Sequence, residues 1–318
     1  MPDIREIRNH MKGVRDTEKL TQAMHMIALS KMRKAKNALD VTRPYFDAIR
    51  LEIYRIFENA DIPNCIYIEG SDEEARESIT GLSGRSYKDS RTRGIIVITS
   101  NKGLAGNYNH AAVREAERLL EETSQAKEQS ILFLIGEYGR RYFSSRNVTI
   151  AENFAFSPDN PNVETAAAIA TRMLDEYESG RLCEIDIVYT DMVNSMVQTV
   201  GSDVMLPFAE SDVKYVSDMI SSKKYTHEME YYPNAETVLK NTVKAYMTGY
   251  IYGALVDCFC SEQNARMNAM DEANHNAEEI MSSLNLQYNH ARQGKITQEI
   301  TEISSGARAL KRKQKPHS

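Results

Sequence analysis

The chain has 318 residues, enough for one large domain or two ordinary ones. Apolar residues make up 42% and charged residues 26%, a balance that can bury a core and excludes a globally disordered chain. The net charge of −6 argues against a general nucleic-acid-binding protein. The longest apolar runs, residues 95–98 and 131–135, are the size of strands, so we expect no transmembrane helix.

The first predicted element is a long amino-terminal helix. Residues 3–43 contain no proline and are rich in good helix formers. Ile4, Ile7, Met11 and Val14 follow the three-four spacing of coiled coils, which resumes at Met24. We assign residues 1–60 to this helical region. Residues 1–36 carry nine Lys and Arg against four Asp and Glu, so we expect this basic arm to meet an acidic partner.

The middle of the chain has the pattern of an α/β domain. Residues 61–92 are polar and turn-rich, which predicts a mobile surface insertion. Within residues 93–232, strand-like runs alternate with helical stretches, which predicts βαβ units around a mostly parallel sheet. The expected strands are 93–99, 131–136, 184–192 and 197–208, and the expected helices are 111–127, 137–145 and 163–177.

The turn after the first strand is where an α/β protein would hold a phosphate group. It reads SNKGLAGN, with Gly103 and Gly106, and matches neither a dinucleotide fingerprint nor a P-loop. Lys102 precedes the glycines instead of following them, so a tight strand-to-helix turn is the expectation. The histidines have no zinc-site spacing, and the four cysteines have the scatter of reduced thiols. We therefore expect no catalytic residues, no metal and no cofactor.

The last predicted element is a second, longer helix. Residues 234–315 contain no proline, and we assign residues 233–318 to it. At 1.5 Å per residue the two helices span roughly 60 Å and roughly 120 Å. Both must return to the same central domain, so we expect an antiparallel coiled coil. The first helix then covers only about half of the second, and the chain from about residue 280 onward lacks an intrachain partner. That segment keeps an apolar stripe, which another protein must cover: Met281, Leu284, Tyr288, Ala291, Ile296, Ile300, Ile303 and Leu310.

Two classes of function fit this organisation. One is a shaft or scaffold within a larger assembly, and the other is a Rossmann-like enzyme with a coiled-coil dimerisation arm. The missing phosphate motif weighs against the enzyme.

Three segments resemble the γ-subunit family of the rotary ATP synthase, the central stalk. They are residues 4–35 (with TEKLTQAM and SKMRKA), residues 100–109 (SNKGLAGNYN) and residues 261–310. The resemblance implies an antiparallel coiled coil inside a hexamer of α and β subunits, with a Rossmann-like foot on the ε subunit and the c-subunit ring. It implies a non-catalytic rotor that couples ion flow to ATP synthesis and regulates ATPase activity. Its place would be peripheral, on the cytoplasmic face of the cell membrane, with membrane association only through the ring.

The resemblance also implies contact residues for the β subunit. Met24 falls where the family has a shaft residue facing β, and Arg266 matches the Arg of the family's ARM motif. Arg292, Gln293 and Thr297 match positions that meet a polar loop of β. The chain departs from the family in its basic ending, KRKQKPHS. It also lacks the paired-cysteine insert of the chloroplast members, so we do not expect thiol control of rotation.

Overall fold

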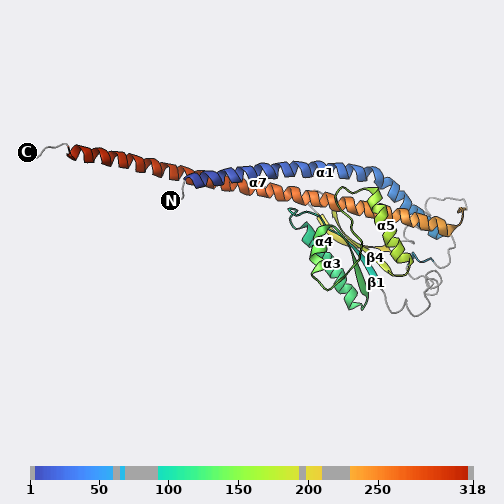
Figure 1. Cartoon of the computed structure of the whole chain (residues 1–318). Coiled ribbons are helices and arrows are strands. Elements are labelled where there is room, and N and C mark those ends of the chain that lie inside the picture. The colour runs from blue at the N-terminus through green and yellow to red at the C-terminus, as the bar shows by residue number, and fades with distance from the viewer. Residues whose placement is uncertain (1–3, 60–64, 69–91, 193–197, 210–229, 314–318) are drawn as a thin grey trace, which may run out of the picture. The chain divides into compact units, whose positions relative to one another are not determined.

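The structure, a computed structural model, describes residues 4–59, 65–68, 92–192, 198–209 and 230–313 (Figure 1). Almost all of the predicted 61–92 insertion and the end of the basic tail lie outside these residues. The chain forms two compact units, one of Met1–Ile27 with Met267–Ser318 and one of Ala28–Arg266. In chain order the elements are α1 (Ile4–Asn59), β1 (Thr92–Ile98), α3 (Tyr108–Gln125), β2 (Gln129–Ile135), α4 (Glu137–Ser144), β3 (Thr149–Ile150), α5 (Val163–Glu178), β4 (Glu184–Met192), β5 (Gln198–Leu206) and α7 (Ala235–Lys313).

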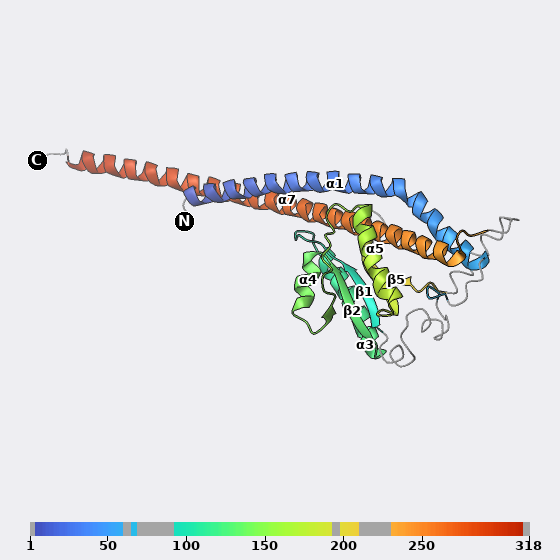
Figure 2. The ribbon, with the colours of Figure 1, turned by 45° about the vertical axis from the view of Figure 1, so that its right-hand side comes forward.

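Helix α1 continues well past the proline-free window that predicted it. Pro44 lies inside the helix, and Figure 2 shows a bend in the second half of α1. Proline removes one backbone hydrogen bond and crowds the preceding turn, which is the usual cause of a sharp helix bend. The turns beyond it are held by burial, since Ile53 and Ile56 are fully enclosed in the core of the second unit. Tertiary packing therefore stabilises the helix on both sides of Pro44, a residue that would end an isolated helix.

A five-stranded sheet forms the centre of the second unit, in the order β3-β2-β1-β4-β5. Neighbouring strands are parallel except β5, which runs antiparallel to β4. The predicted mostly parallel α/β sheet is thus confirmed. Strand β3 was not predicted, because its two residues are too few to show a pattern in the sequence.

Strand β1 is buried on both faces, which explains its unbroken apolar run. Residues Ile95 to Ile98 are fully enclosed. Ile95 and Val97 pack on the side of α3 and α4, where Phe143 is buried with them. Ile96 and Ile98 belong to the larger cluster that includes α5 and the second-unit parts of α1 and α7. Parallel strands covered on both sides need apolar side chains at every position, not at every second one.

No helix in the part of the chain that the structure describes has the length and apolarity needed to cross a membrane.

A buried charge cluster lies at the amino-terminal edge of this sheet. Arg93 of β1 lies 3.0 Å from Glu184, 3.5 Å from Asp186 and 3.9 Å from Glu128. The side chain of Asp186 is only 3% exposed. Burial raises the pKa of Asp186 to about 7, the nearby carboxylate of Glu184 adds to the rise, and Arg93 opposes it. The folded chain therefore binds a proton here that an unfolded chain releases at much lower pH.

This cluster predicts a pH-dependent stability. Between the ordinary pKa of an aspartate and about 7, the folded state holds more protons, so the free energy of unfolding should fall as pH rises. Denaturant unfolding at pH 5 and pH 8 should show Asp186 contributing a loss on the order of 2 kcal/mol. The variant Asp186→Asn cannot ionise and should lack that part of the loss. Parallel pH profiles for the two proteins would contradict the assignment.

Candidate functional site

The first unit is an antiparallel pair of helices whose register three polar contacts define. Arg8 donates a hydrogen bond to the hydroxyl of Tyr288 at 3.0 Å, and His25 lies 3.5 Å from Asp271. Between them, Thr21 donates to the side chain of Asn274. From Arg8 to His25 the chain advances seventeen residues in α1, and the partner moves back seventeen residues in α7. The helices therefore keep one register along the whole paired section.

The paired section has a narrow apolar seam closed by a cation at its end. Ile7 of α1 and Met270, Ala277 and Leu284 of α7 are buried. At the end of the seam, the guanidinium carbon of Arg8 lies 5.8 Å from the centre of the Tyr288 ring. The hydrogen bond from Arg8 lowers the pKa of this phenol. Buried positions three to seven residues apart are those expected of a coiled coil.

Beyond this section α7 continues without a partner in the described chain. The same register places Ile4, the first residue of α1, opposite Arg292. From there α7 runs on to Lys313 (Figures 1 and 2), and we call Gln293–Lys313 the free segment. It exposes Ile296 by 43%, Ile300 by 61% and Ile303 by 73%.

The expectation that pairing ends near residue 280 was wrong. Leu284 is only 6% exposed, and Tyr288 is bonded to Arg8. The error came from the length of α1, which was taken from the proline-free window alone, whereas the helix has 56 residues. At 1.5 Å per residue it spans about 84 Å and covers more of α7 than a helix of roughly 60 Å would.

Three predicted contact residues lie where the free segment begins. Arg292, Gln293 and Thr297 are all exposed. The backbone carbonyl of Thr297 accepts a bond from the hydroxyl of Thr301 one turn later. Met24, the fourth predicted residue of this unit, is half-buried on α1.

The outer surface of α1 near Met24 is more apolar than the sequence pattern indicated. Leu20, Met26 and Ile27 are each more than half exposed. Ile27 follows Met24 at three-residue spacing, which by itself is the spacing of a coiled-coil seam, yet Ile27 is exposed. Only the partner helix decides which apolar positions are covered, and α7 covers a narrower strip than α1 offers.

The turn after β1 is a strand-to-helix connection, as predicted. The side-chain oxygen of Asn109 accepts a hydrogen bond from the backbone N–H of Ser100 at 2.9 Å. Asn101 donates to Ser157 and Asp159 and accepts from the backbone of Glu137. The turn lies at the carboxyl end of β1, between β2 and β4, the position where open α/β sheets usually hold ligands. Here its polar groups are engaged by the chain itself.

Arg266 of α7 closes this position from the other side. Its guanidinium donates to Glu262 at 2.5 Å and to the carbonyl of Gly103 at 3.3 Å. The side chains of Arg266 and Glu262 are 14% and 3% exposed. Burial raises the pKa of Glu262, and the bond from Arg266 works against the rise. The predicted partner-contact arginine is therefore occupied within its own unit.

Further polar contacts, which sequence reasoning missed, attach α7 to strands β4 and β5. The thiol sulfur of Cys258 accepts a bond from the backbone N–H of Thr190 at 3.2 Å. Ser261 donates to the carbonyl of Thr190, and Gln198 donates to the carbonyl of Ser261 at 2.8 Å. No local sequence pattern marks these residues, because each bond joins segments far apart in the chain.

Comparisons with known proteins agree on one family. A family model described as ATP synthase matches residues 3–310. An ATP synthase gamma chain of Acetivibrio thermocellus is 34% identical over 98% of this chain and 100% of its own length. The chain belongs to the ATP synthase γ-chain family. A sodium-ion-specific ATP synthase gamma chain of Acetobacterium woodii is 30% identical over 97% of this chain and 99% of its own.

Chains in solved ATP synthase structures share the fold. A chain in the OSCP/F1/c-ring structure of the Euglena gracilis mitochondrial ATP synthase has a TM-score of 0.63 at 18% identity, covering 99% of this chain and 97% of that one. A chain of the central stalk/c-ring structure from Tetrahymena thermophila has a TM-score of 0.55 at 23% identity, covering 80% and 99%. The fold of this chain, with its long helices and mixed sheet, is therefore also found in those structures.

The pairing geometry predicts where backbone amides exchange. In the isolated chain, amides of residues 297–313 should exchange at least about 100-fold faster than those of residues 271–288, because only the latter lie in the paired section. Hydrogen exchange followed by mass spectrometry measures both segments in one sample. Equal protection would mean that the free segment folds back on its own chain.

The Arg266 contacts predict a structural role for that residue. Replacing Arg266 by Met keeps most of the stem but leaves Glu262 buried without its cation, which should cost roughly 3 kcal/mol of unfolding free energy. Adding Glu262→Gln should recover much of this loss. A cost below about 0.5 kcal/mol for Arg266→Met would leave the arginine available for a partner instead.

Proposed function

We propose that this chain is the central-stalk rotor of an ATP synthase, coupling transmembrane ion flow to ATP synthesis in an α/β hexamer by rotation and regulating its ATPase activity. The observation that carries the proposal is the paired two-helix section continued by a bare helix with an exposed apolar stripe. Ile296, Ile300 and Ile303 lie along that helix without an intrachain partner among the described residues. Because the chain belongs to the γ-chain family, we propose that the α and β subunits of the hexamer cover this stripe.

The free segment needs a sheath for a physical reason. A lone helix of about 20 residues is marginal in water, and its exposed apolar side chains favour association. A closed ring of α and β subunits would cover the segment on every side. We also propose that the α/β domain of the second unit contacts the ε subunit and the c-subunit ring. The chain would then be held peripherally, at the cytoplasmic face of the cell membrane, through the ring alone.

The paired section suits the transmission of torque. Its seam and its cross-helix contacts, from Arg8 with Tyr288 to His25 with Asp271, keep the helices in one register. Sliding one helix along the other would break all of them together. Two registered helices resist twisting and bending better than one helix does.

We propose no catalytic role for the chain itself. The position where α/β sheets usually hold a nucleotide is filled here by Asn101, Asn109 and Arg266. Catalysis would belong to the hexamer, and the contribution of this chain is its changing contact with each β subunit.

The residues proposed to meet β divide by their surroundings. Arg292, Gln293 and Thr297 are exposed at the start of the free segment and can bond to a polar loop of β directly. Met24 would contribute apolar contact beside the exposed side chains of α1. We propose that Arg266 acts through the turn at Gly103, which it holds, because its own side chain is engaged.

Coupling variants test the proposal. A charge-assisted bond from Arg292 to a β carboxylate would be worth about 1.5–3 kcal/mol, at those rotor angles where the two meet. Arg292→Ala and Gln293→Ala should therefore change ATP turnover of the assembled complex more than twofold while complex yield stays normal. The chain without its partners should show no ATP hydrolysis.

Arg308→Ala is the matched control. Arg308 is also an exposed arginine of the free segment, but sixteen residues along an ideal helix place it on nearly the opposite face from Arg292. Its loss should leave turnover within twofold. If all three variants assemble and turn over like the unmodified chain, these contacts do not carry coupling. Failure of the chain to assemble with α and β subunits at all would overturn the rotor proposal.

A further inference from the structure

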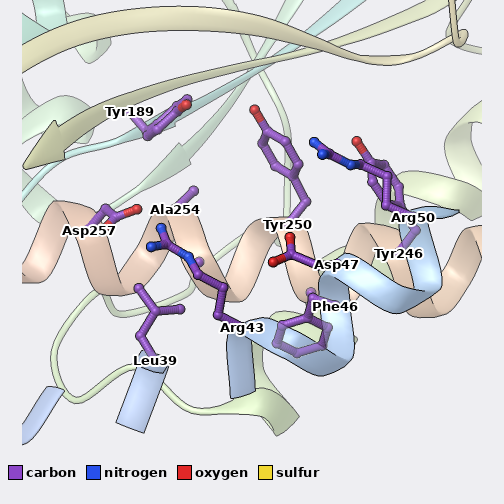
Figure 3. Close-up of a pocket in the computed structure, with 12 residues that line it drawn as sticks. Leu39, Arg43, Phe46, Asp47, Arg50, Tyr189, Tyr246, Tyr250, Ala254 and Asp257 are labelled. Atoms are coloured by element: carbon purple, nitrogen blue, oxygen red, sulfur yellow. The ribbon is translucent and has the colours of Figure 1, made fainter. Parts of the chain in front are cut away.

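A cavity of about 200 Å³ lies within the second unit, between α1, α7 and strand β4. Figure 3 shows side chains from all three elements around it. Nothing in the proposed rotor function uses this cavity, and none of the predicted β-contact residues lines it.

Two glycines of α7 create the space. Gly249 and Gly253 lie one turn apart and line the cavity. A Cβ atom at Gly249 would come within 2.1 Å of the ring of Phe46, so this glycine lets α1 and α7 approach closely. A Cβ atom at Gly253 would meet nothing within 4 Å, so the open volume lies beside this second glycine.

Four of the twelve lining residues are aromatic, and two of their rings are fixed. The hydroxyls of Tyr189 and Tyr250 both donate to Asp203, at 2.8 and 2.5 Å. The rings of Tyr189 and Tyr250 meet edge to face at 6.3 Å, and Tyr246 lies 5.9 Å from Tyr250. The two hydroxyl groups are therefore already hydrogen-bonded, and a ligand would pack against the parts of the rings that face the cavity.

Three charged side chains of α1 stand along the cavity at successive turns. Arg43, Asp47 and Arg50 share one helix face, and all three line the cavity. In the view of Figure 3 the ring of Tyr250 lies between the two guanidinium groups. Across the described residues, no ion pair or hydrogen bond engages either arginine or Asp47, even though their spacing would allow one. An arginine presents a planar fork of donors that matches carboxylate and phosphate groups.

The carboxylate on the opposite wall is partly neutralised by its surroundings. Burial raises the pKa of Asp257 to about 6, with Asp191 and Asp40 adding to the rise. Arg43 and Lys36 act in the other direction. Burial outweighs these cations, so Asp257 keeps its proton to a higher pH than an ordinary aspartate does and repels an anion less than a fully ionised carboxylate would.

We propose that this cavity binds a small aromatic anion, whose ring packs among the tyrosines and whose carboxylate or phosphate group bonds to Arg43 and Arg50. The size of the cavity sets the size of the ligand. A cavity of about 150 Å³ accepts benzene, so 200 Å³ accommodates one ring with one substituent. Asp47 and Asp257 limit the affinity, since they repel the same group that the arginines attract.

The test is calorimetric titration of the full chain with three probes of one shape. These are 4-hydroxybenzoate, its neutral amide and 4-hydroxybenzylamine. The benzoate should bind with a Kd in the high-micromolar to low-millimolar range expected for about ten heavy atoms, and the other two at least tenfold more weakly. Inorganic phosphate and 4-hydroxyphenyl phosphate distinguish a bare anion site from one that needs the ring. Equal binding of the three probes, tighter binding of the amine, or phosphate binding without any gain from the ring would overturn the proposal.

Substitutions test whether the ligand binds in this cavity and whether the binding depends on its positive charge. Arg43→Gln with Arg50→Gln should weaken benzoate binding at least tenfold, whereas Asp47→Asn should strengthen it. Gly253→Leu should fill the cavity and abolish binding without removing a charge. Gly306→Leu is the matched control, because Gly306 is also a helical glycine of α7 with open space around it, far along the chain from the cavity. Benzoate binding that survives Gly253→Leu, or that Asp47→Asn weakens, would place the ligand elsewhere.

Discussion

The antiparallel pairing of α1 with α7 is the constraint on which the rest of the structure depends. In the first unit it aligns Arg8 with Tyr288 and His25 with Asp271. In the second unit the same two helices meet again, where the ring of Phe46 packs against Gly249 and Cys260 donates to the carbonyl of Met32. The amino terminus of α1 fixes where α7 loses its partner. The exposed surface that a partner protein must cover is therefore set by the length of the shorter helix.

The sheet of the second unit serves as a platform for α7. One face carries α3 and α4, and the other carries α5 with parts of α1 and α7. Polar bonds from Cys258 and Ser261 to Thr190 fix the long helix at β4. Arg266 then engages the turn after β1, at the place that a nucleotide would take in an α/β enzyme. A fold common among enzymes is used here to hold a helix.

Much of this fold could be predicted from the sequence, for identifiable reasons. Strands covered on both faces read as unbroken apolar runs, so β1 and β2 were found within a residue or two. The two long helices were found because proline is absent from them over long windows. The proline-free window by itself stops at residue 43, because the continuation of α1 through Pro44 depends on the burial of Ile53 and Ile56 by distant segments.

The candidate site was less predictable than the fold. The spacing of Glu262 and Arg266 is that of a helical ion pair, but only the structure shows that both are buried. The resemblance to known γ subunits named Arg292, Gln293 and Thr297, and helical periodicity alone would not have separated them from other polar residues of the free segment. The apolar surface at Leu20 and Met26 was missed because it needs the position of α7 to be recognised.

The two glycines within the free segment, Gly294 and Gly306, have a consequence for how such a molecule joins a larger assembly. Each lowers helix stability by about 1 kcal/mol relative to alanine, in a segment that receives no help from a neighbouring helix. Outside its sheath the segment exchanges between helix and coil, and it becomes a single rod only as neighbours enclose it. Ordering the segment offsets part of the favourable free energy of association. Once it is ordered and enclosed, the helix can dissociate only by unfolding or by moving out along its own axis.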